Sequence, residues 1–257
     1  RIWKEVTSTS PSGLHLGHMK ALLKQEKKLV NLQEKEEKQE EKTYLSDRMP
    51  KIRSSLINAA IETGHVFSWW KNITMTMLEK VPGMPLITKL RIIHLLENYF
   101  NLMIGILFGR RIMYEGEKLE AFSDSQYGSC KQRSTNDVIL FKHLWYSIIR
   151  IMKTDATTFN NDAKSCFDRI VMPLASLLSQ RIGMDSRACE LFLKVLILGK
   201  YTVKTRHGLL EGMYSTTDQY TLHGLGQGGC RSPSIWTIVS TVIMACMEEQ
   251  GNGMSIC

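Results

Sequence analysis

The chain has 257 residues, of which 43% are apolar, and a formal net charge of +8. This length allows one large domain or two small ones with a hydrophobic core, and the positive charge favours partners with phosphate backbones. The six cysteines are scattered and form no CxxC pair. This argues against a zinc site or a disulfide framework and favours a reducing, intracellular compartment, nucleus or cytoplasm.

We also expect no membrane partner. The first residues lack the pattern of a signal peptide, and the apolar run from Ile235 to Met247 is too short to cross a bilayer. The chain starts at Arg1 without a methionine and stops at Cys257 soon after this run, so we expect a fragment of a longer protein.

The first part of the chain has helical patterns. Residues 24–42 combine six lysines with six acids and contain no glycine or proline, which predicts a solvated helix with i to i+4 ion pairs. Asp47 to Lys71 shows an amphipathic pattern that predicts a second helix ending at Gly64. We expect the aromatic cluster that follows to lie in the core; its members are Phe67, Trp69 and Trp70.

A hairpin and a helix are predicted next. Ile73 to Leu78 alternates polar and apolar side chains and is followed by Val81-Pro82-Gly83, which indicates a strand and a turn. Arg91 to Leu96 is the predicted partner strand. Tyr99 to Glu117 is predicted to be helical.

The remaining predicted elements alternate helix with loop and strand. A polar loop covers residues 121–135, and a helix from Asp137 to Lys153 follows, capped by Thr135 or Asn136. Residues Ala156 to Phe159 predict a short strand. Two further helices are expected, Pro173 to Ile182 and Ser232 to Met247. This order is typical of an α+β fold rather than a βαβ repeat.

Two segments carry chemistry. Asp162 follows the predicted strand at Ala156 to Phe159, and carboxylates at the end of a strand can hold the Mg²⁺ ions that clamp the attacking and leaving oxygens of a phosphoryl transfer. Asp162 alone is equally compatible with a helix cap. The glycine-rich run from Gly224 to Gly229 offers backbone that a nucleotide can approach, or forms a flexible loop. Its spacing matches neither a Walker motif nor a dinucleotide fingerprint.

Both segments resemble motifs of reverse transcriptases, closest to those of non-LTR retrotransposons. DAKSCFD, from Asp162 to Asp168, resembles motif A (DxxKAFD), and QGGCRSP, which begins at Gln227, resembles motif B (PQGSPLSP). The resemblance implies that Asp162 is catalytic and binds Mg²⁺ or Mn²⁺. It also implies that Phe167 senses the sugar 2′-position and that Gln227 and Gly228 contact the nucleotide.

Motif B is not matched throughout. Gly226 stands where the family usually has proline, and Gly229-Cys230-Arg231 stands where it has Ser-Pro-Leu. These differences loosen the turn but retain Gln227.

Segments upstream continue the resemblance in the same order. Met77 to Lys80 and Leu90 to Leu95 are similar to the IPK and RPISL segments of the fingers, which implies that Lys80 and Arg91 bind the incoming triphosphate. Without the resemblance these two residues would be ordinary solvated cations. Gln126 to Thr135 resembles QxGFRxGRST, which implies that Arg133 and Ser134 bind the template.

The resemblance implies an RNA-directed DNA polymerase with right-hand architecture. A helical leader would occupy residues 1–70, and residues 71–257 would form the fingers and an incomplete palm with an antiparallel sheet. Its partners would be an RNA template, a DNA primer and dNTPs. The YxDD hairpin of motif C, which carries the other metal-binding aspartates, does not occur before Cys257. We therefore expect this chain to be inactive alone and a longer parent to carry two-metal nucleotidyl transfer.

Two other functions remain open. Pro11 to His18, PSGLHLGH, resembles the HIGH signature of class I aminoacyl-tRNA synthetases, in which His15 and His18 would bind ATP phosphates during adenylate formation. The parallel βα pattern and the KMSKS-like loop of that fold are missing, so the alternative is that Ser12 caps a helix on which the histidines pack. The third possibility is a noncatalytic remnant that binds nucleic acid through its basic surface.

Overall fold

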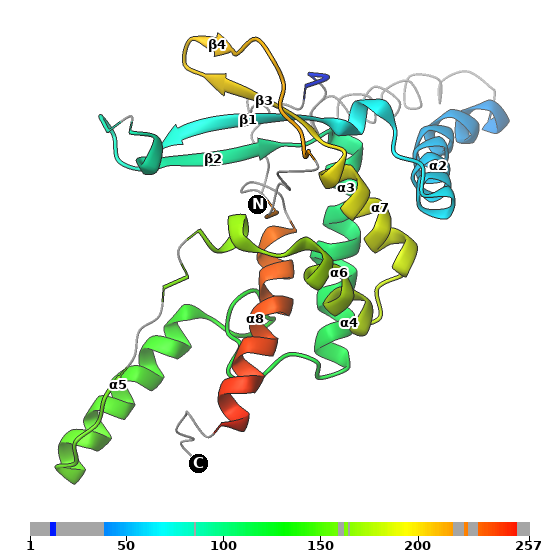
Figure 1. Ribbon diagram of the computed structural model, residues 1–257. Helices are drawn as coiled ribbons and strands as arrows, with labels where there is room; N and C mark the ends of the chain where they lie inside the picture. Colours follow the sequence, from blue (N-terminus) through cyan, green and yellow to red (C-terminus); the bar gives the residue numbers. More distant parts are fainter. Residues whose placement is uncertain are drawn as a thin grey trace. The chain divides into compact units, whose positions relative to one another are not determined.

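The computed structural model describes residues 11–13, 39–84, 86–158, 162–163, 165–217, 224–225 and 231–250. Helices combine with one small mixed sheet (Figure 1), which confirms the α+β class. The chain divides into two compact units. Unit 1 contains Arg1–Ile104, Asp185–Leu222 and Gly226–Gly229, and unit 2 contains Gly105–Met184, His223–Leu225 and Cys230–Cys257.

Unit 1 contains a four-stranded sheet with the order β2-β1-β3-β4. The predicted hairpin is confirmed, because β1 (Asn72–Glu79) pairs antiparallel with β2 (Leu90–Leu95). On its other side, β1 pairs parallel with β3 (Lys200–Thr205), and the two-residue β4 (Gly208–Leu209) completes the sheet. The sheet is therefore mixed rather than antiparallel, because the β1–β3 pair is parallel and the other two pairs are antiparallel.

Helices supply the core of unit 1. Helix α2 (Gln39–Thr63) ends at Gly64, which has a φ of +64°, as predicted. Trp70, in the short helix η1 (Ser68–Lys71), packs against Phe100 of α3 (Asn98–Ile106) with 5.4 Å between the centroids of the tilted rings. Trp70 is 1% exposed but Trp69 is 46% exposed, so the prediction that both tryptophans lie in the core is wrong for Trp69.

Helix α7 (Ser186–Ile197) closes this core, although the sequence patterns did not predict it. Its Phe192 ring lies 6.4 Å from that of Phe100 and is 2% exposed. Asp185 caps the helix by accepting hydrogen bonds from the amides of Arg187 and Ala188 at 2.9 and 3.2 Å. The hydrogen bond from the Ala188 amide is the main reason that the pKa of the Asp185 carboxyl lies below its ordinary value.

A continuous helical stretch runs from α3 through a π-helical turn, η3 (Leu107–Arg111), into α4 (Ile112–Lys118). The helix predicted from Tyr99 to Glu117 is confirmed, with one widened turn inside it. The division between the two units falls within α3, after Ile104. None of the helices in the described part of the chain combines the length and the hydropathy that a bilayer crossing requires.

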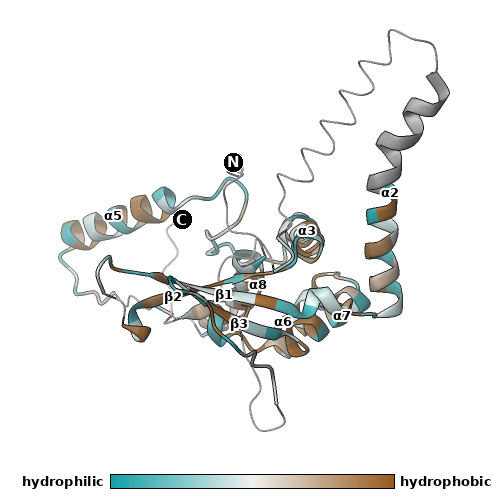
Figure 2. Ribbon diagram, turned by 90° about the horizontal axis from the view of Figure 1, so that it is seen from above, coloured by the Kyte–Doolittle hydropathy of each residue, from teal (hydrophilic) through white to brown (hydrophobic). Residues whose placement is uncertain are grey.

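Helices and loops make up unit 2, and none of its described residues belongs to a strand. Helix α6 (Met172–Arg181) packs against α8 (Ser232–Glu249), whose Ile235 and Ile238 are almost fully buried. Helix α5 (Thr135–Met152) has no buried residue, and apolar bands recur along it in Figure 2. The strand expected at Ala156 to Phe159 is absent from residues 156–158, and Phe159 lies outside the described residues. The β-branched residues of this segment find no neighbouring strand there.

Candidate functional site

The two motif-bearing segments of unit 2 are hydrogen-bonded to each other. The amide of Leu225 donates to the carbonyl of Phe167 at 2.8 Å, and the amide of Gly224 donates to the carbonyl of Ile170 at 3.1 Å. Phe167 belongs to a short helix, η4 (Cys166–Arg169), inside the segment that resembles motif A. The chain that leads into the motif B-like segment therefore lies directly on the motif A-like segment.

Gly224 allows this close contact. Its φ is +92°, and a Cβ at this position would lie 2.6 Å from the Cα of Asp168 and 2.7 Å from its carbonyl carbon and oxygen. Only glycine fits, because both the dihedral angle and the space exclude a side chain. The sequence predicted a glycine-rich surface for a nucleotide, whereas the structure uses this glycine to pack two protein segments together.

In the sequence, Asp162 precedes the residues of this junction. Its side chain is exposed. It caps no helix of the described chain, since the N-cap of η4 is Ser165 and that of α6 is Val171. The interpretation of Asp162 as a helix cap is therefore wrong. Phe167 is half-buried, and Asp168 is exposed.

The carboxylate of Asp162 has the hard oxygen donors that Mg²⁺ and Mn²⁺ prefer. No group of three histidine, cysteine, aspartate or glutamate side chains gathers around a common point among the residues that the structure describes. The carboxylate of Asp162 has the chemistry of one ligand for such a cation, and binding of Mg²⁺ or Mn²⁺ by Asp162 stays a prediction.

Arg231, at the start of α8, is a residue whose role the sequence did not indicate. It is fully buried, and its Nη2 donates to the carbonyl of Leu225 at 3.1 Å. Leu225 is the residue that binds Phe167, so Phe167, Leu225 and Arg231 form one chain of contacts. An arginine is normally a surface residue, and nothing in the local pattern distinguishes this one. Gln227 and Gly228 lie outside the described residues.

The third motif-like segment of unit 2 also contacts α8. Gln126 is 6% exposed, and its Nε2 donates to Ser240 Oγ at 2.7 Å. The hydroxyl of Thr237 donates to the carbonyl of Gly128 at 3.1 Å. The segment from Gln126 and the junction around Leu225 are therefore both attached to α8.

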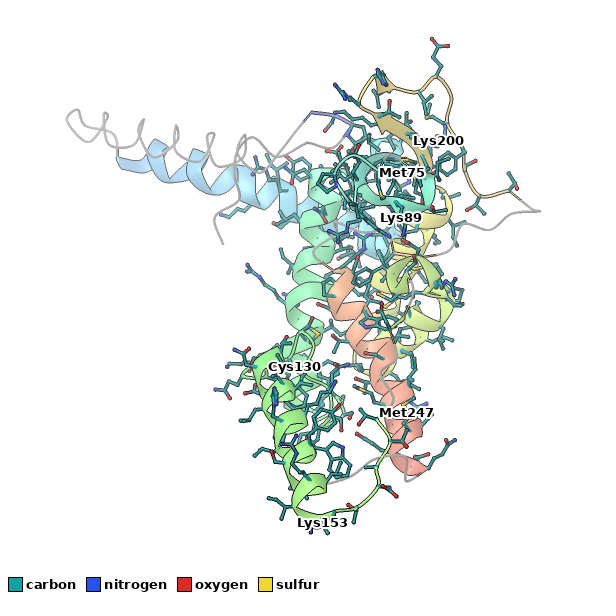
Figure 3. The ribbon with its side chains drawn as sticks, turned by 90° about the vertical axis from the view of Figure 1, so that its left-hand side faces the viewer. Met75, Lys89, Cys130, Lys153, Lys200 and Met247 are labelled. Atoms are coloured by element: carbon teal, nitrogen blue, oxygen red, sulfur yellow. The ribbon has the colours of Figure 1, made fainter. Side chains whose placement is uncertain are left out.

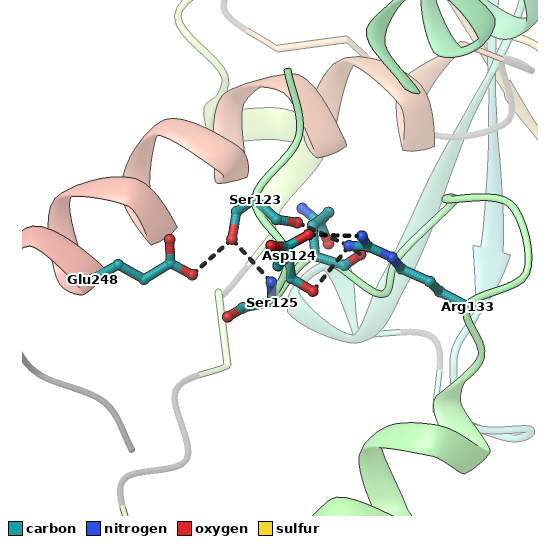
Figure 4. A network of polar contacts seen from close by, with 6 residues as sticks. Ser123, Asp124, Ser125, Arg133 and Glu248 are labelled. Atoms are coloured by element: carbon teal, nitrogen blue, oxygen red, sulfur yellow. Dashed lines mark hydrogen bonds and ion pairs between the residues drawn. The ribbon is translucent and has the colours of Figure 1, made fainter. Parts of the chain in front are cut away.

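Arg133 and Ser134 have structural partners. The Nη1 of Arg133 donates to the carbonyls of Ser123, Asp124 and Gln126, each at 2.9 Å, and its Nη2 lies 3.2 Å from Asp124 Oδ1 (Figure 4). Ser134 is the N-cap of α5 and forms a capping box with Asp137, so the predicted cap at Thr135 or Asn136 is wrong. Binding of the template by Arg133 and Ser134 stays a prediction.

The same loop reaches the far end of α8. Ser123 Oγ donates to Glu248 Oε1 at 2.7 Å (Figure 4). This hydrogen bond is the largest cause that lowers the pKa of the Glu248 carboxyl.

In unit 1, Lys80 and Arg91 lie at the same end of the β1–β2 hairpin. Lys80 directly follows β1, and its amide donates to the carbonyl of Lys89, two residues before Arg91, which is the register partner of Leu78. Both side chains are exposed. That these two cations bind a triphosphate stays a prediction.

The segment that resembles a HIGH signature is described only at residues 11–13. The hydroxyl of Ser12 donates to Glu97 Oε1 at 2.9 Å, and Glu97 is 2% exposed. Ser12 thus binds a buried carboxylate next to the start of α3. His15 and His18 lie outside the described residues.

Comparison with known proteins finds no match, either among protein-family models or among curated protein sequences.

Proposed function

We propose that this chain is the fingers and part of the palm of a reverse transcriptase, an RNA-directed DNA polymerase of the non-LTR retrotransposon type. The observation that carries the proposal is the convergence in unit 2 of three segments that are distant in the sequence. The motif A-like segment, the chain entering the motif B-like segment and the loop from Gln126 are joined through Leu225, Arg231 and α8.

The proposed roles follow the chemistry of the residues. Asp162 is the catalytic carboxylate and binds Mg²⁺ or Mn²⁺, which when bound neutralises phosphate charge and orients the reacting oxygens. Phe167 packs against the sugar. The amide of Leu225 binds the carbonyl of Phe167, which holds the Phe167 backbone in place. A changed substituent on the sugar would therefore meet a ring whose position is fixed.

The remaining roles concern binding. Lys80 and Arg91 offset the charge of the incoming dNTP triphosphate, since two adjacent cations on a hairpin can contact several phosphate oxygens. Gln227 and Gly228 contact the nucleotide, and Arg133 and Ser134 contact the RNA template on which the DNA primer is extended. The guanidinium of Arg133 already binds the carbonyls of Ser123, Asp124 and Gln126. We therefore expect Arg133 and this loop to contact the template together.

Primer extension on an RNA template tests the proposal. The proteins are this chain, a longer parent chain that includes the two adjacent aspartates of a motif C, and the parent with Asp162→Asn. We expect extension by the parent alone and a loss of roughly 100-fold or more in Asp162→Asn, since even outer-shell partners of a metal are worth about 10- to 100-fold. Asp155→Asn, an exposed aspartate just upstream, is the matched control and should extend normally.

Two results would contradict the proposal. Equal extension rates for Asp162→Asn and the unchanged parent would rule out Asp162 as the metal ligand. A parent that forms adenylates from ATP and an amino acid but extends no primer would favour the synthetase-like alternative.

A further inference from the structure

Arg231 is a buried cation at the first turn of α8. It is 0% exposed, and its Nη2 donates to the carbonyl of Leu225 at 3.1 Å. Arg231 lies at the start of the helix and Met247 near its end (Figure 3). The positive charge therefore lies at the positive end of the helix dipole and away from water, and both placements cost free energy. The stability of α8 alone does not account for an arginine at this position.

Leu225 connects Arg231 to the segment that resembles motif A. The carbonyl of Leu225 accepts the hydrogen bond from Arg231, and its amide donates to the carbonyl of Phe167 at 2.8 Å. Leu225 is 1% exposed, and hydrogen bonds in such a buried environment are stronger than those in water and polarise one another. A change at Arg231 is therefore transmitted through one residue to the backbone of Phe167.

The short helix η4 depends on contacts with Gly224 and Leu225. The Leu225 amide binds the carbonyl of Phe167, and the Gly224 amide donates to the carbonyl of Ile170, which follows η4. The backbone of Gly224 also lies against that of Asp168. Because η4 has only four residues, its internal hydrogen bonds are too few to fix its position. The half-buried ring of Phe167 is therefore positioned by these contacts from outside the helix.

The sequence beside Leu225 gives a reason for the arginine. Four of the six residues from Gly224 to Gly229 are glycines, which have the greatest backbone freedom of all residues. Gly226 stands where motif B usually has proline, which would fix φ, and Arg231 stands where the motif has leucine. A segment without this proline needs another constraint, and the hydrogen bond from Arg231 to Leu225 supplies one.

We infer that Arg231 is a positioning residue for sugar selection: through Leu225 it holds the backbone of Phe167, so that the Phe167 ring excludes a 2′-hydroxyl group. The inference rests on the proposed function and adds to it a residue that acts through another. A ribonucleotide is larger at the 2′-position by one oxygen atom, so a small displacement of the ring is enough to admit it. Loss of the Arg231 hydrogen bond should therefore lower the selectivity for dNTPs over rNTPs.

Primer extension by the longer parent chain tests the inference. On an RNA template, kcat/KM is measured for dATP and for ATP, which differ only in the 2′-hydroxyl group. Arg231→Met removes the hydrogen-bond donors and should lower the dATP/ATP ratio by about 10-fold or more, the effect of one hydrogen bond to a charged group. Arg231→Lys keeps a charged donor and should lose less. Ile238→Ala removes buried packing about two turns further along α8 and should lower Tm without changing the ratio.

A double variant tests whether Arg231 acts through Phe167. Phe167→Ala removes the ring, so the addition of Arg231→Met to it should lower the dATP/ATP ratio no further. Additive losses would mean that Arg231 affects the sugar by another path and would overturn the inference. A ratio that is unchanged in Arg231→Met alone would overturn it as well.

Hydrogen exchange separates this inference from the proposed function, because it needs neither substrate nor activity. In the present chain, Arg231→Met should speed exchange of the Leu225 amide by about 10-fold or more, since its hydrogen bond to Phe167 opens more often. Unchanged exchange would contradict the role of Arg231. Faster exchange in a protein whose parent extends no primer would reject the polymerase assignment, and with it the role in sugar selection, but not the contact. A parent that extends primers with an unchanged ratio in Arg231→Met would reject the role of Arg231 alone.

Discussion

The contact between Gly224 and the backbone of Asp168 is possible only because Gly224 has no side chain. Its Cα approaches the backbone of Asp168, and its φ of +92° lies in the region that glycine tolerates best. The contact joins the chain around Phe167 to Gly224 and Leu225, which precede the motif B-like segment. The glycine is required by protein packing, whatever the neighbouring residues bind.

We expect Gly224→Ala to lower the free energy of unfolding of unit 2 by roughly 3 kcal/mol or more, since strain in the left-handed region and overpacking each cost about 1 to 3 kcal/mol. Gly183→Ala is the matched control in the same unit, because Gly183 has a φ of +101° and a Cβ at that position would meet nothing within 4 Å. It should lose only the strain, roughly 1 to 2 kcal/mol. Urea denaturation measures both, and equal losses would contradict the close contact.

At the scale of elements, the start of α5 shows what local chemistry decides. Ser134 accepts from the Asp137 amide, and the Asp137 carboxylate accepts from the Ser134 amide at 2.7 Å. Ser134, Thr135 and Asn136 are all good capping residues, so the sequence narrows the cap to three neighbours. The backbone entering the helix selects Ser134, which has an extended conformation.

Ser134→Ala should lower the free energy of unfolding by about 1 kcal/mol, the usual cost of losing an N-cap. Thr135→Ala, at the next position, should change it by less than about 0.5 kcal/mol, because alanine is the better helix former there. Thermal denaturation followed by circular dichroism compares the two. A larger loss in Thr135→Ala would move the cap to Thr135.

At the scale of the whole molecule, the core of unit 1 joins segments that are far apart in the chain. Trp70, Phe100 and Phe192 come from η1, α3 and α7 and form one line of aromatic contacts. The sheet has the same property, since β1 pairs with the distant β3. Unit 1 therefore needs residues 185–222 to complete both its core and its sheet.

Phe192→Ala should lower the free energy of unfolding of unit 1 by about 3 to 5 kcal/mol, the range for a buried phenylalanine. Phe141→Ala on α5 is the matched control and should cost less than about 1 kcal/mol, since Phe141 is 46% exposed. Hydrogen exchange should show lost protection in β1, α3 and α7 for the first variant alone. Unchanged exchange in β1 would mean that the sheet does not depend on this core.

The sequence by itself determined the elements whose signals are local. The β1–β2 hairpin, the end of α2 at Gly64, and helices α6 and α8 follow from periodicity and turn residues within a short window. The net charge of +8 was equally visible. The resemblance of four segments to a polymerase came from residue order alone, and it predicted Asp162, Lys80 and Arg91 without reference to any contact.

Only the tertiary structure decided which distant residues meet. The parallel pairing of β3 with β1 and the contact of Gly224 with Asp168 join residues far apart in the chain. The burial of Arg231 is likewise not indicated by the residues around it in the sequence. Trp69 and Trp70 are adjacent and chemically identical, yet one is exposed and the other is core. Periodicity within a segment indicates which face of a helix or strand is apolar. It carries no information about the element that packs on that face. That packing partner determines which residues are buried and in which register strands pair.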